Sequence, residues 1–300
     1  DVQIIHCRSY LTNLVGLFLK LITKNFLIFD MRGLWPEEIA LGLKKGRKSI
    51  FYKGLNLLEK YNFNYSDSVV SLTNSAKIYL QQKYVFKKQK IAVIPTCVDT
   101  SRFKYSFKKS SRINKFSCIG TVLSDWFLID WLRRFFYCVH KIDNSAELEI
   151  ITRDDKEKIE SRLSFSKNIF KKVKIKSAEP EDMPLLIKKC SASAFFFTPG
   201  IAKLGSSPTR FGEILAVGRP VICNSGVGDL DTLIEKNKVG VIVKDEKMSS
   251  MEEAVFSLYK LISNPNTSKR CRDLAENFYS LSSGSKKYSE IYESLLKKKF

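Results

Sequence analysis

The segment SSPTRFGE, which ends at Glu213, contains residue types whose spacing suits the binding of an anion. Ser207 is a favoured N-cap and Pro208 a favoured first helical residue, so we predict that a helix begins here with free N–H groups and a positive dipole. Thr209 adds a hydroxyl group and Arg210 a guanidinium group that could hold a phosphate. One turn on, the Glu213 carboxylate could accept hydrogen bonds from a vicinal diol. The alternative is a weak local ion pair between Glu213 and Arg210.

A second candidate binding segment, NSGVGD, follows the next predicted strand. Gly226 and Gly228 could bring backbone N–H groups close to a ligand. Asp229-Leu230-Asp231 is the only literal DxD candidate, and we interpret it as the start of a helix rather than as a metal site. Two histidines and seven widely spaced cysteines without a CxxC give no zinc-binding pattern. We therefore expect no metal, and free thiols as in a reducing cytosol.

The elements that must position these residues alternate along the chain. Short β-branched runs separated by amphipathic segments predict parallel strands that are buried on both faces. In the first part we expect strands at 2–7, 26–30, 68–73 and 90–95, with helices at 10–23, 36–63 (two stretches) and 75–84. After a polar, basic linker at 97–112 we expect strands at 116–121, 147–152, 172–177, 192–198, 220–224 and 239–244, with helices between and after them. This order predicts two Rossmann-like α/β domains, residues 1–110 and 111–300, with ligands at the carboxyl ends of the strands.

Composition limits the class of protein. An apolar fraction of 44% is typical of a globular chain, and no signal peptide is visible. The chain starts at Asp1 with a strand-like run, which we interpret as a truncated N-terminus. The net charge is +20, and more than half of the excess lies in the first 110 residues, including the basic clusters at 44–48, 87–90 and 108–115. Such a charge favours a polyanion or an anionic membrane surface, or is simply a solvated lysine-rich surface.

Several motifs together resemble those of a known family. SPTRFGEILAVGRPVI, followed by GVGDLDTLI and VGVIV, resembles the nucleotide-sugar site of GT-B glycosyltransferases, particularly family 4. FDMRGLWPEE, VVSLTNSAKIYL and IAVIPTCVDTSRF are similar to the end of the acceptor domain of that family, and CIGTV to the first strand and loop of its donor domain. The resemblance covers nearly the whole chain and implies two domains that face each other across a cleft, the N-terminal one incomplete.

The resemblance also implies roles for single residues. Glu213 would bind the ribose hydroxyls of a nucleotide sugar, and the loop AEPEDM would lie near the base. The diphosphate would lie near residues from two loops and the helix start: Gly120, Thr121, Ser207, Thr209 and Arg210. Gly226 to Asp229 would line the sugar and diphosphate end.

The chain departs from the family pattern at two places. The first glutamate of the usual E-x7-E pair is replaced by Gly205, which leaves the identity of the sugar open. Where many members carry a histidine, this chain has DMRG, so that Asp30 and Arg32 are candidates for contact with the sugar or the acceptor. With Arg210 and Glu213, they form the set of candidate catalytic residues.

The resemblance implies a retaining, metal-independent hexosyltransferase with no cofactor beyond its nucleotide-diphosphate-sugar donor. The acceptor would be a glycan or a lipid-linked molecule, as in cell-surface polysaccharide synthesis, and the enzyme would be cytoplasmic or peripheral on the inner face of the membrane. Three alternatives stay open: a sugar-nucleotide 2-epimerase of the same fold, an inactive member, and a basic nucleic-acid-binding module. Against the last, no nucleic-acid-binding motif is found, and we expect no nucleic-acid partner.

Overall fold

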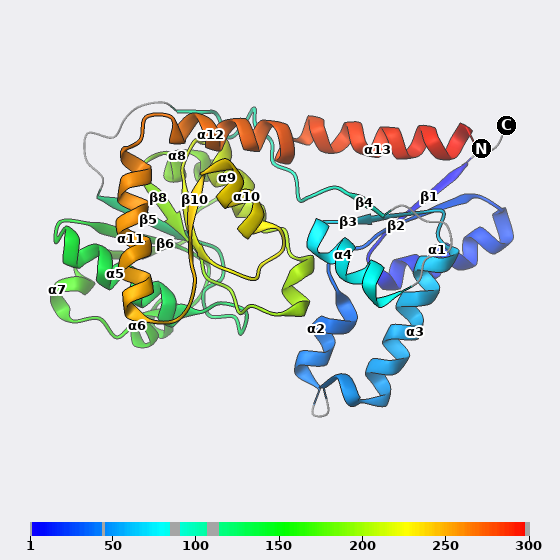
Figure 1. The fold of residues 1–300 in the computed structure, drawn as a ribbon, viewed down its shortest axis with the longest axis horizontal. Helices are drawn as coiled ribbons and strands as arrows, with labels where there is room; N and C mark the ends of the chain where they lie inside the picture. The colour runs from blue at the N-terminus through cyan, green and yellow to red at the C-terminus, as the bar shows by residue number, and fades with distance from the viewer. Residues whose placement is uncertain (1, 44–45, 85–90, 107–113, 298–300) are drawn as a thin grey trace.

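A computed structural model describes residues 2–43, 46–84, 91–106 and 114–297. It contains two parallel sheets with helices around them, one in each half of an elongated molecule (Figure 1). The predicted fold class, two Rossmann-like domains, is confirmed. The predicted domain boundary at 110/111 and the basic cluster at 87–90 lie outside the described residues, as do residues 44–45 and 108–113 of the other two basic clusters.

The first sheet has four described strands, which lie in chain order. They are β1 (Ile4–Arg8), β2 (Phe26–Asp30), β3 (Ser68–Ser71) and β4 (Ile91–Val93). Neighbouring strands pair in parallel, and the register places Arg8 beside Asp30 at the carboxyl ends of β1 and β2. All four strands were predicted, since each is a short apolar run bounded by polar residues.

The helices of this part follow the strands in alternation. They are α1 (Tyr10–Thr23), α2 (Trp35–Gly42), the short η1 (Gly46–Lys48), α3 (Ile50–Tyr65) and α4 (Asn74–Lys83). The hydroxyls of Ser49 and Thr73 cap α3 and α4 by accepting N–H bonds. One face of the sheet, with Phe29 and Val69, packs against Phe63 of α3 and Leu80 of α4.

The second sheet has six described strands in the order β10-β9-β8-β5-β6-β7. They are β5 (Lys115–Ile119), β6 (Glu147–Ile151), β7 (Val173–Lys176), β8 (Ala192–Ala194), β9 (Val221–Asn224) and β10 (Gly240–Val243). The connecting elements are α5 (Ile129–Ile142), α6 (Lys156–Leu163), α7 (Lys167–Phe170), η2 (Pro180–Asp182), α8 (Met183–Lys188), η3 (Ile201–Gly205), α9 (Thr209–Ala216) and α10 (Leu230–Asn237). The strand order reverses between β5 and β8, which is where a doubly wound sheet binds its ligand.

The C-terminal segment leaves the second domain and returns to the first. After α11 (Met248–Ser263), α12 (Thr267–Leu274) and η4 (Ala275–Tyr279), the long helix α13 (Leu281–Leu296) extends across to the first sheet (Figure 1). Leu295 packs with Ile28, Val70 and Ile94, on the face opposite Phe29. The predicted second domain, residues 111–300, therefore includes a helix that packs in the core of the first domain.

The two domains also touch through side chains and short loops. The Asp229 carboxylate accepts hydrogen bonds from the backbone N–H groups of Asn74 and Ser75 at 2.7 and 2.8 Å, at the start of α4. The Thr73 hydroxyl donates to the Leu204 carbonyl at 2.5 Å. Leu204 itself packs on the apolar cluster of the first domain, so η3 belongs to the junction of the domains.

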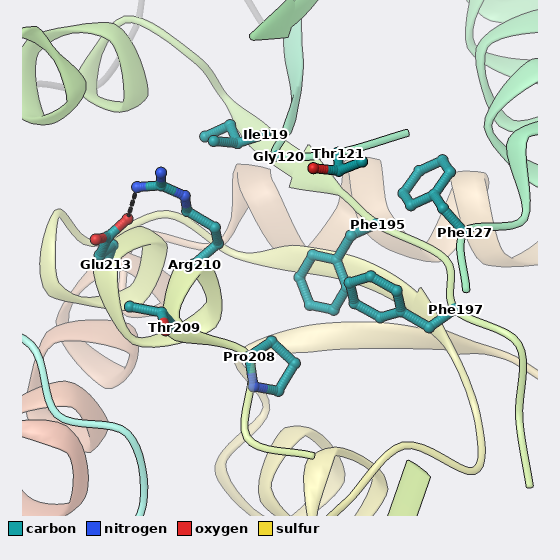
Figure 2. A pocket seen from close by; sticks show the side chains of 10 residues that line it. All are labelled: Ile119, Gly120, Thr121, Phe127, Phe195, Phe197, Pro208, Thr209, Arg210 and Glu213. Atoms are coloured by element: carbon teal, nitrogen blue, oxygen red, sulfur yellow. Dashed lines mark hydrogen bonds and ion pairs between the residues drawn. The ribbon is translucent and has the colours of Figure 1, made fainter. Parts of the chain in front are cut away.

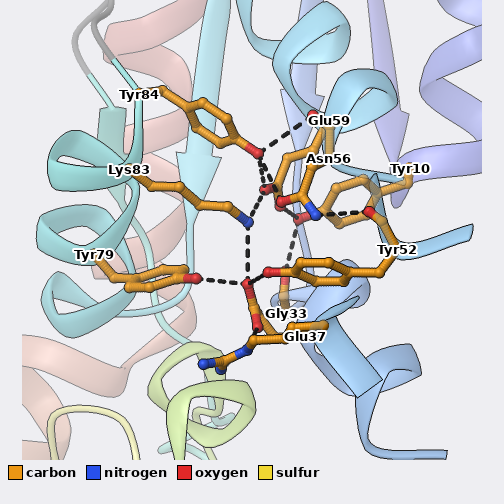
Figure 3. A network of polar contacts seen from close by, with 10 residues as sticks. Tyr10, Gly33, Glu37, Tyr52, Asn56, Glu59, Tyr79, Lys83 and Tyr84 are labelled. Atoms are coloured by element: carbon orange, nitrogen blue, oxygen red, sulfur yellow. Dashed lines mark hydrogen bonds and ion pairs between the residues drawn. The ribbon is translucent and has the colours of Figure 1, made fainter. Parts of the chain in front are cut away.

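A buried polar network lies in the first domain between α2, α3 and α4 (Figure 3). The Lys83 ammonium group donates to Glu37 Oε1 at 3.1 Å and to Glu59 Oε2 at 2.9 Å. Both carboxylate side chains are almost fully buried, at 1% and 0% exposure. Buried charges of this kind are stable only when they are paired and hydrogen-bonded.

Tyrosine hydroxyls complete the network. Tyr52 and Tyr79 donate to Glu37, and Arg47 forms an ion pair with its other oxygen at 2.8 Å. Burial on its own would raise the pKa of the Glu37 carboxyl, but hydrogen bonds from the two tyrosines and from Lys83 hold it below its ordinary value. The network therefore keeps Glu37 charged inside the domain.

Candidate active site

Five of the predicted site residues line one pocket of about 420 Å³, which we call the α9 pocket (Figure 2). They are Gly120, Thr121, Thr209, Arg210 and Glu213. Gly120 and Thr121 follow β5, and the other three lie on α9, which follows β8. The pocket is thus at the carboxyl ends of these two strands, as the pattern predicted.

The start of α9 differs from the prediction in one detail. The N-cap is Pro208 rather than Ser207, and no side chain caps this terminus. The Ser207 hydroxyl instead accepts a hydrogen bond from the backbone N–H of Thr96 in the first domain, at 3.2 Å. An uncapped helix start keeps unsatisfied N–H groups and a positive dipole, which suit an anion.

Arg210 and Glu213 form an ion pair across one turn of α9 (Figure 2). The local pairing that the sequence left open is therefore present. The Glu213 side chain is 12% exposed and that of Arg210 is 41% exposed, so the carboxylate at the pocket wall is paired with a more exposed cation. Whether Glu213 also accepts ribose hydroxyls stays a prediction.

Another part of the pocket wall is the loop that follows β5. Gly120 has a φ of +115°, which favours glycine, and its N–H group donates to the Ile151 carbonyl at 3.0 Å. A Cβ at this position would meet nothing within 4 Å, so the space beside Gly120 is open. Phe127, Phe195 and Phe197 close the pocket on the side away from Arg210 and Glu213 (Figure 2).

A second pocket of about 360 Å³, the η2 pocket, adjoins the first. The two share Ile119, Gly120, Thr121 and Arg210. Its other wall includes Ala178, Pro180 and Met183, which belong to the segment AEPEDM predicted to lie near the base. The structure therefore brings that segment next to the predicted diphosphate residues.

A third pocket of about 440 Å³, the interdomain pocket, takes residues from both domains. Ser207 and Thr209 line it from the second domain, and Arg32 lines it from the first. Asp30 lies behind Arg32, with 3.7 Å between its Oδ1 and Arg32 Nη1, and accepts a hydrogen bond from the Tyr288 hydroxyl at 3.1 Å. Burial, followed by the nearby Asp30 charge, raises the pKa of Tyr288, which keeps it a hydrogen-bond donor.

Gly226 and Gly228 line none of these three pockets. Both have positive φ, so the predicted glycine turn is present. The N–H group of Gly226 donates to Asp231 Oδ2 at 3.1 Å, and that of Gly228 to the Lys203 carbonyl at 2.9 Å. Because both N–H groups are used within the protein, the predicted donation to a ligand does not match this arrangement.

Gly205, where the family pattern has a glutamate, is buried at the domain junction. A Cβ at this position would lie 3.0 Å from the Leu34 nitrogen and 3.1 Å from the Gly33 Cα. Both contacts are with backbone atoms, which cannot move aside as a flexible side chain can. The glycine therefore lets η3 approach the first domain more closely than a glutamate would.

The DxD segment forms the start of α10, as predicted, with Asp229 as the N-cap. Its carboxylate bonds to α4, and that of Asp231 accepts from the glycine turn. Among the described residues there is no group of three or more histidine, cysteine or acidic side chains that could hold a metal ion.

The sequence interpretation missed one cation of the site, Lys203 on η3, which lines the interdomain pocket. Its ammonium group lies 3.9 Å from the centroid of the Trp126 ring. Neither residue belongs to a motif, and they are 77 positions apart in a chain whose two loops meet only when the domain folds.

Comparisons with known proteins bear on the chain as a whole. Residues 1–102 match the family model described as Glycosyltransferase Family 4. A search of the curated proteins found no match. Among solved structures, sucrose-phosphate synthase from Thermosynechococcus elongatus is 14% identical with a TM-score of 0.71, over 98% of this chain and 73% of that chain.

Two further structures are similar over nearly the whole chain. HepE from Anabaena, in complex with UDP, is 14% identical with a TM-score of 0.74, over 97% of this chain and 79% of that chain. A glycosyltransferase from Rickettsia africae is 16% identical with a TM-score of 0.72, over 99% of this chain and 77% of that chain. At these identities the likeness shows the fold. Residues 1–102 thus match a glycosyltransferase family model, and both domains share the GT-B fold of these solved structures.

Proposed function

We propose that the chain is a retaining, metal-independent glycosyltransferase that moves a hexose from a nucleotide-diphosphate sugar to a glycan or lipid-linked acceptor. The observation that carries this proposal is the α9 pocket, where an uncapped helix start, a guanidinium group and an open glycine loop meet at the switch point of the sheet. HepE, which has the same fold, has been solved with UDP and with UDP-glucose, and this supports a nucleotide sugar as the donor here.

In this proposal the diphosphate lies against the first turn of α9, near Thr209 and Arg210. Breaking the bond between the anomeric carbon and the phosphate oxygen leaves a nucleoside diphosphate with growing negative charge. Helix N–H groups and the Arg210 guanidinium stabilise that charge without a metal ion. The nucleoside occupies the η2 pocket, and the Glu213 carboxylate accepts from its ribose hydroxyls once Arg210 turns toward the phosphate.

Thermal unfolding with UDP, GDP, ADP and CDP, in the presence of EDTA, tests the donor site. A nucleotide at 100 times its Kd stabilises the folded state by about 2.7 kcal/mol. We expect one diphosphate to raise the Tm of the wild type and of the control Glu253→Ala, whose exposed side chain lies on α11. Glu213→Ala should lose that shift. If none of the four nucleotides shifts the wild type, or if the shift needs a divalent ion, the proposal is wrong.

The proposed contact with a membrane surface is made by helix α1. Leu11, Val15, Phe18 and Ile22 are spaced along one face of this helix, and each is 60% to 64% exposed. The helix ends next to the exposed Lys24, in a chain with a net charge of +20. An apolar face beside positive charge suits the surface of an anionic bilayer. Among the described residues, no helix is long and apolar enough to span a membrane.

Sedimentation with liposomes tests this surface. We expect the protein to sediment with anionic vesicles and much less with neutral ones, because both burial of apolar area and charge attraction contribute. Phe18→Ser should weaken the binding. The control Ile142→Ser changes an apolar residue of the second domain that is 53% exposed, and should have no effect. Equal sedimentation with both vesicle types would contradict the membrane partner.

A further inference from the structure

The interdomain pocket adjoins the α9 pocket, with which it shares Phe197, Pro208 and Thr209. If the donor diphosphate lies at the start of α9, whatever occupies the interdomain pocket is the next group along: the transferred sugar or the acceptor. We infer that this group carries a negative charge, either a carboxylate or a phosphate. The inference rests on the proposed function and deepens it by naming the substrate class.

Charge is the first argument. Three cationic side chains line the pocket: Arg8 and Arg32 from the first domain and Lys203 from the second. None of the described residues that line it is acidic. A site for a neutral sugar commonly includes carboxylates or amides, which accept hydrogen bonds from sugar hydroxyls. This pocket instead offers charge-assisted donors, which bind anions most strongly.

The two arginines keep donors free for a ligand. Arg8 is exposed at the end of β1 and has no ion pair among the described residues. Arg32 approaches Asp30 only to 3.7 Å between Nη1 and Oδ1, which is beyond hydrogen-bond distance. A guanidinium group has five N–H donors, so both arginines can hold a carboxylate or phosphate in the bidentate way.

Lys203 is the half-buried cation on the other side. Its ammonium group lies 3.9 Å from the Trp126 ring centroid and 5.8 Å from that of Phe197. No hydrogen bond from its Nζ is found among the described residues. Burial lowers the pKa of Lys203, and the charge of Glu38 acts in the opposite direction. A partly desolvated ammonium without an acceptor gains the most from an anionic ligand.

Gly205 explains why these cations meet. Because η3 lacks a side chain at this position, its backbone approaches Gly33 and Leu34 directly. Arg32 is next to Gly33 in the first domain, and Lys203 is two residues before Gly205 in the second. The close contact therefore brings cations of both domains to one pocket, where the family pattern would place a carboxylate.

The experiment has two arms, which distinguish a charge on the sugar from one on the acceptor. Both use the nucleoside diphosphate that stabilises the protein in the panel above. In the donor arm, calorimetry compares its glucose and glucuronate sugar nucleotides, which differ in a carboxylate. In the acceptor arm, glucose is compared with glucose 6-phosphate on the nucleotide-saturated protein. We expect the anionic probe to bind about tenfold tighter in one arm, as one charge-assisted contact allows.

Variants then test whether the preference for the anionic probe arises in the interdomain pocket. Arg8→Gln and Lys203→Met should abolish it, while Lys158→Gln, on the exposed side of α6, should keep it. Lys203→Met retains an apolar stem against Trp126, which limits damage to the fold. Equal binding of both probes in both arms would overturn the inference. The inference would also be overturned if the variants weaken binding of the nucleoside diphosphate itself as much as binding of the anionic probe, since the cations would then bind the diphosphate.

The experiments distinguish failure of the proposed function from failure of the inference about the interdomain pocket. If none of the four nucleotides binds, the donor site is refuted, and the comparison of glucose 6-phosphate with glucose is made on the free protein. A preference for the phosphate that Arg8→Gln removes would still support the anionic pocket. No preference would refute it as well.

Discussion

Removal of Lys83 should be among the most damaging single changes in the first domain. Its ammonium group is the only cation that contacts the Glu59 carboxylate among the described residues, at 2.9 Å. In Lys83→Met, Glu59 keeps hydrogen bonds from the hydroxyls of Tyr10 and Tyr84, both at 2.7 Å, but no counter-ion. Glu37 keeps its pair with Arg47. The main effect of Lys83→Met is therefore to leave the buried Glu59 carboxylate without a counter-ion.

Breaking a buried ion pair by removing one partner costs about 3–5 kcal/mol. With a urea m-value of about 2 kcal/mol/M, the midpoint of unfolding of the first domain should fall by about 2 M. Urea titration at pH 7, followed by circular dichroism, measures this shift. Lys77→Met is the matched control, because Lys77 lies on the same helix and has no ion pair among the described residues. It should change the midpoint by less than a quarter of that amount.

The double variant Lys83→Met/Glu59→Gln separates charge from packing. The amide of glutamine has nearly the shape of the carboxylate and carries no charge, so most of the lost stability should return. If Lys83→Met costs less than about 1 kcal/mol, the network is not shielded from water as its burial implies. A double variant no more stable than the single one would show that lost packing, not charge, is the cause.

Three further outcomes follow from other contacts. The pKa of Glu37 is lowered from 4.5 in the folded state, so its contribution to stability is present above pH 4.5 and is lost as the pH falls through the lowered pKa. In Glu37→Gln, the urea midpoint should therefore depend less on pH between pH 5 and pH 3 than in the wild type. Asp229→Ala, which removes the cross-domain cap of α4, should cost about 2 kcal/mol in thermal unfolding, against about 1 for the intradomain cap Asp155→Ala; equal losses would contradict a role at the junction. Gly205→Glu should destabilise the protein by about 1–3 kcal/mol through contact with Gly33 and so lower the Tm, and an unchanged Tm would mean that η3 can shift.

The sheets could be predicted because their signals are local. The run FLIFD begins with four apolar residues without alternation and is buried on both faces, and its predicted bounds coincide with those of β2. Each of the ten described strands overlaps a predicted strand, although β7 (VKIK) alternates apolar and charged residues. By contrast, α7 was not predicted, since KNIF is only four residues long and too short for a helical period.

The candidate site could be predicted only in part. Residues close in sequence to the start of α9 do line its pocket, because helix position fixes them together. Ser207 was assigned to the wrong role, since a backbone N–H group more than a hundred residues away takes its hydroxyl. Arg8 and Lys203 meet only through the contact of two domains, and no local pattern carries that information.

The return of α13 to the first sheet bears on how the protein is made. Ile28, Val70 and Ile94 are all synthesised in the first third of the chain, but Leu295, which packs against them, comes about 200 residues later. At a typical rate of 5–20 residues per second, that face of the nascent domain stays uncovered for roughly 10–40 seconds. This domain therefore completes its core only after the second domain has been synthesised. For that interval its uncovered sheet is the surface on which a chaperone would act.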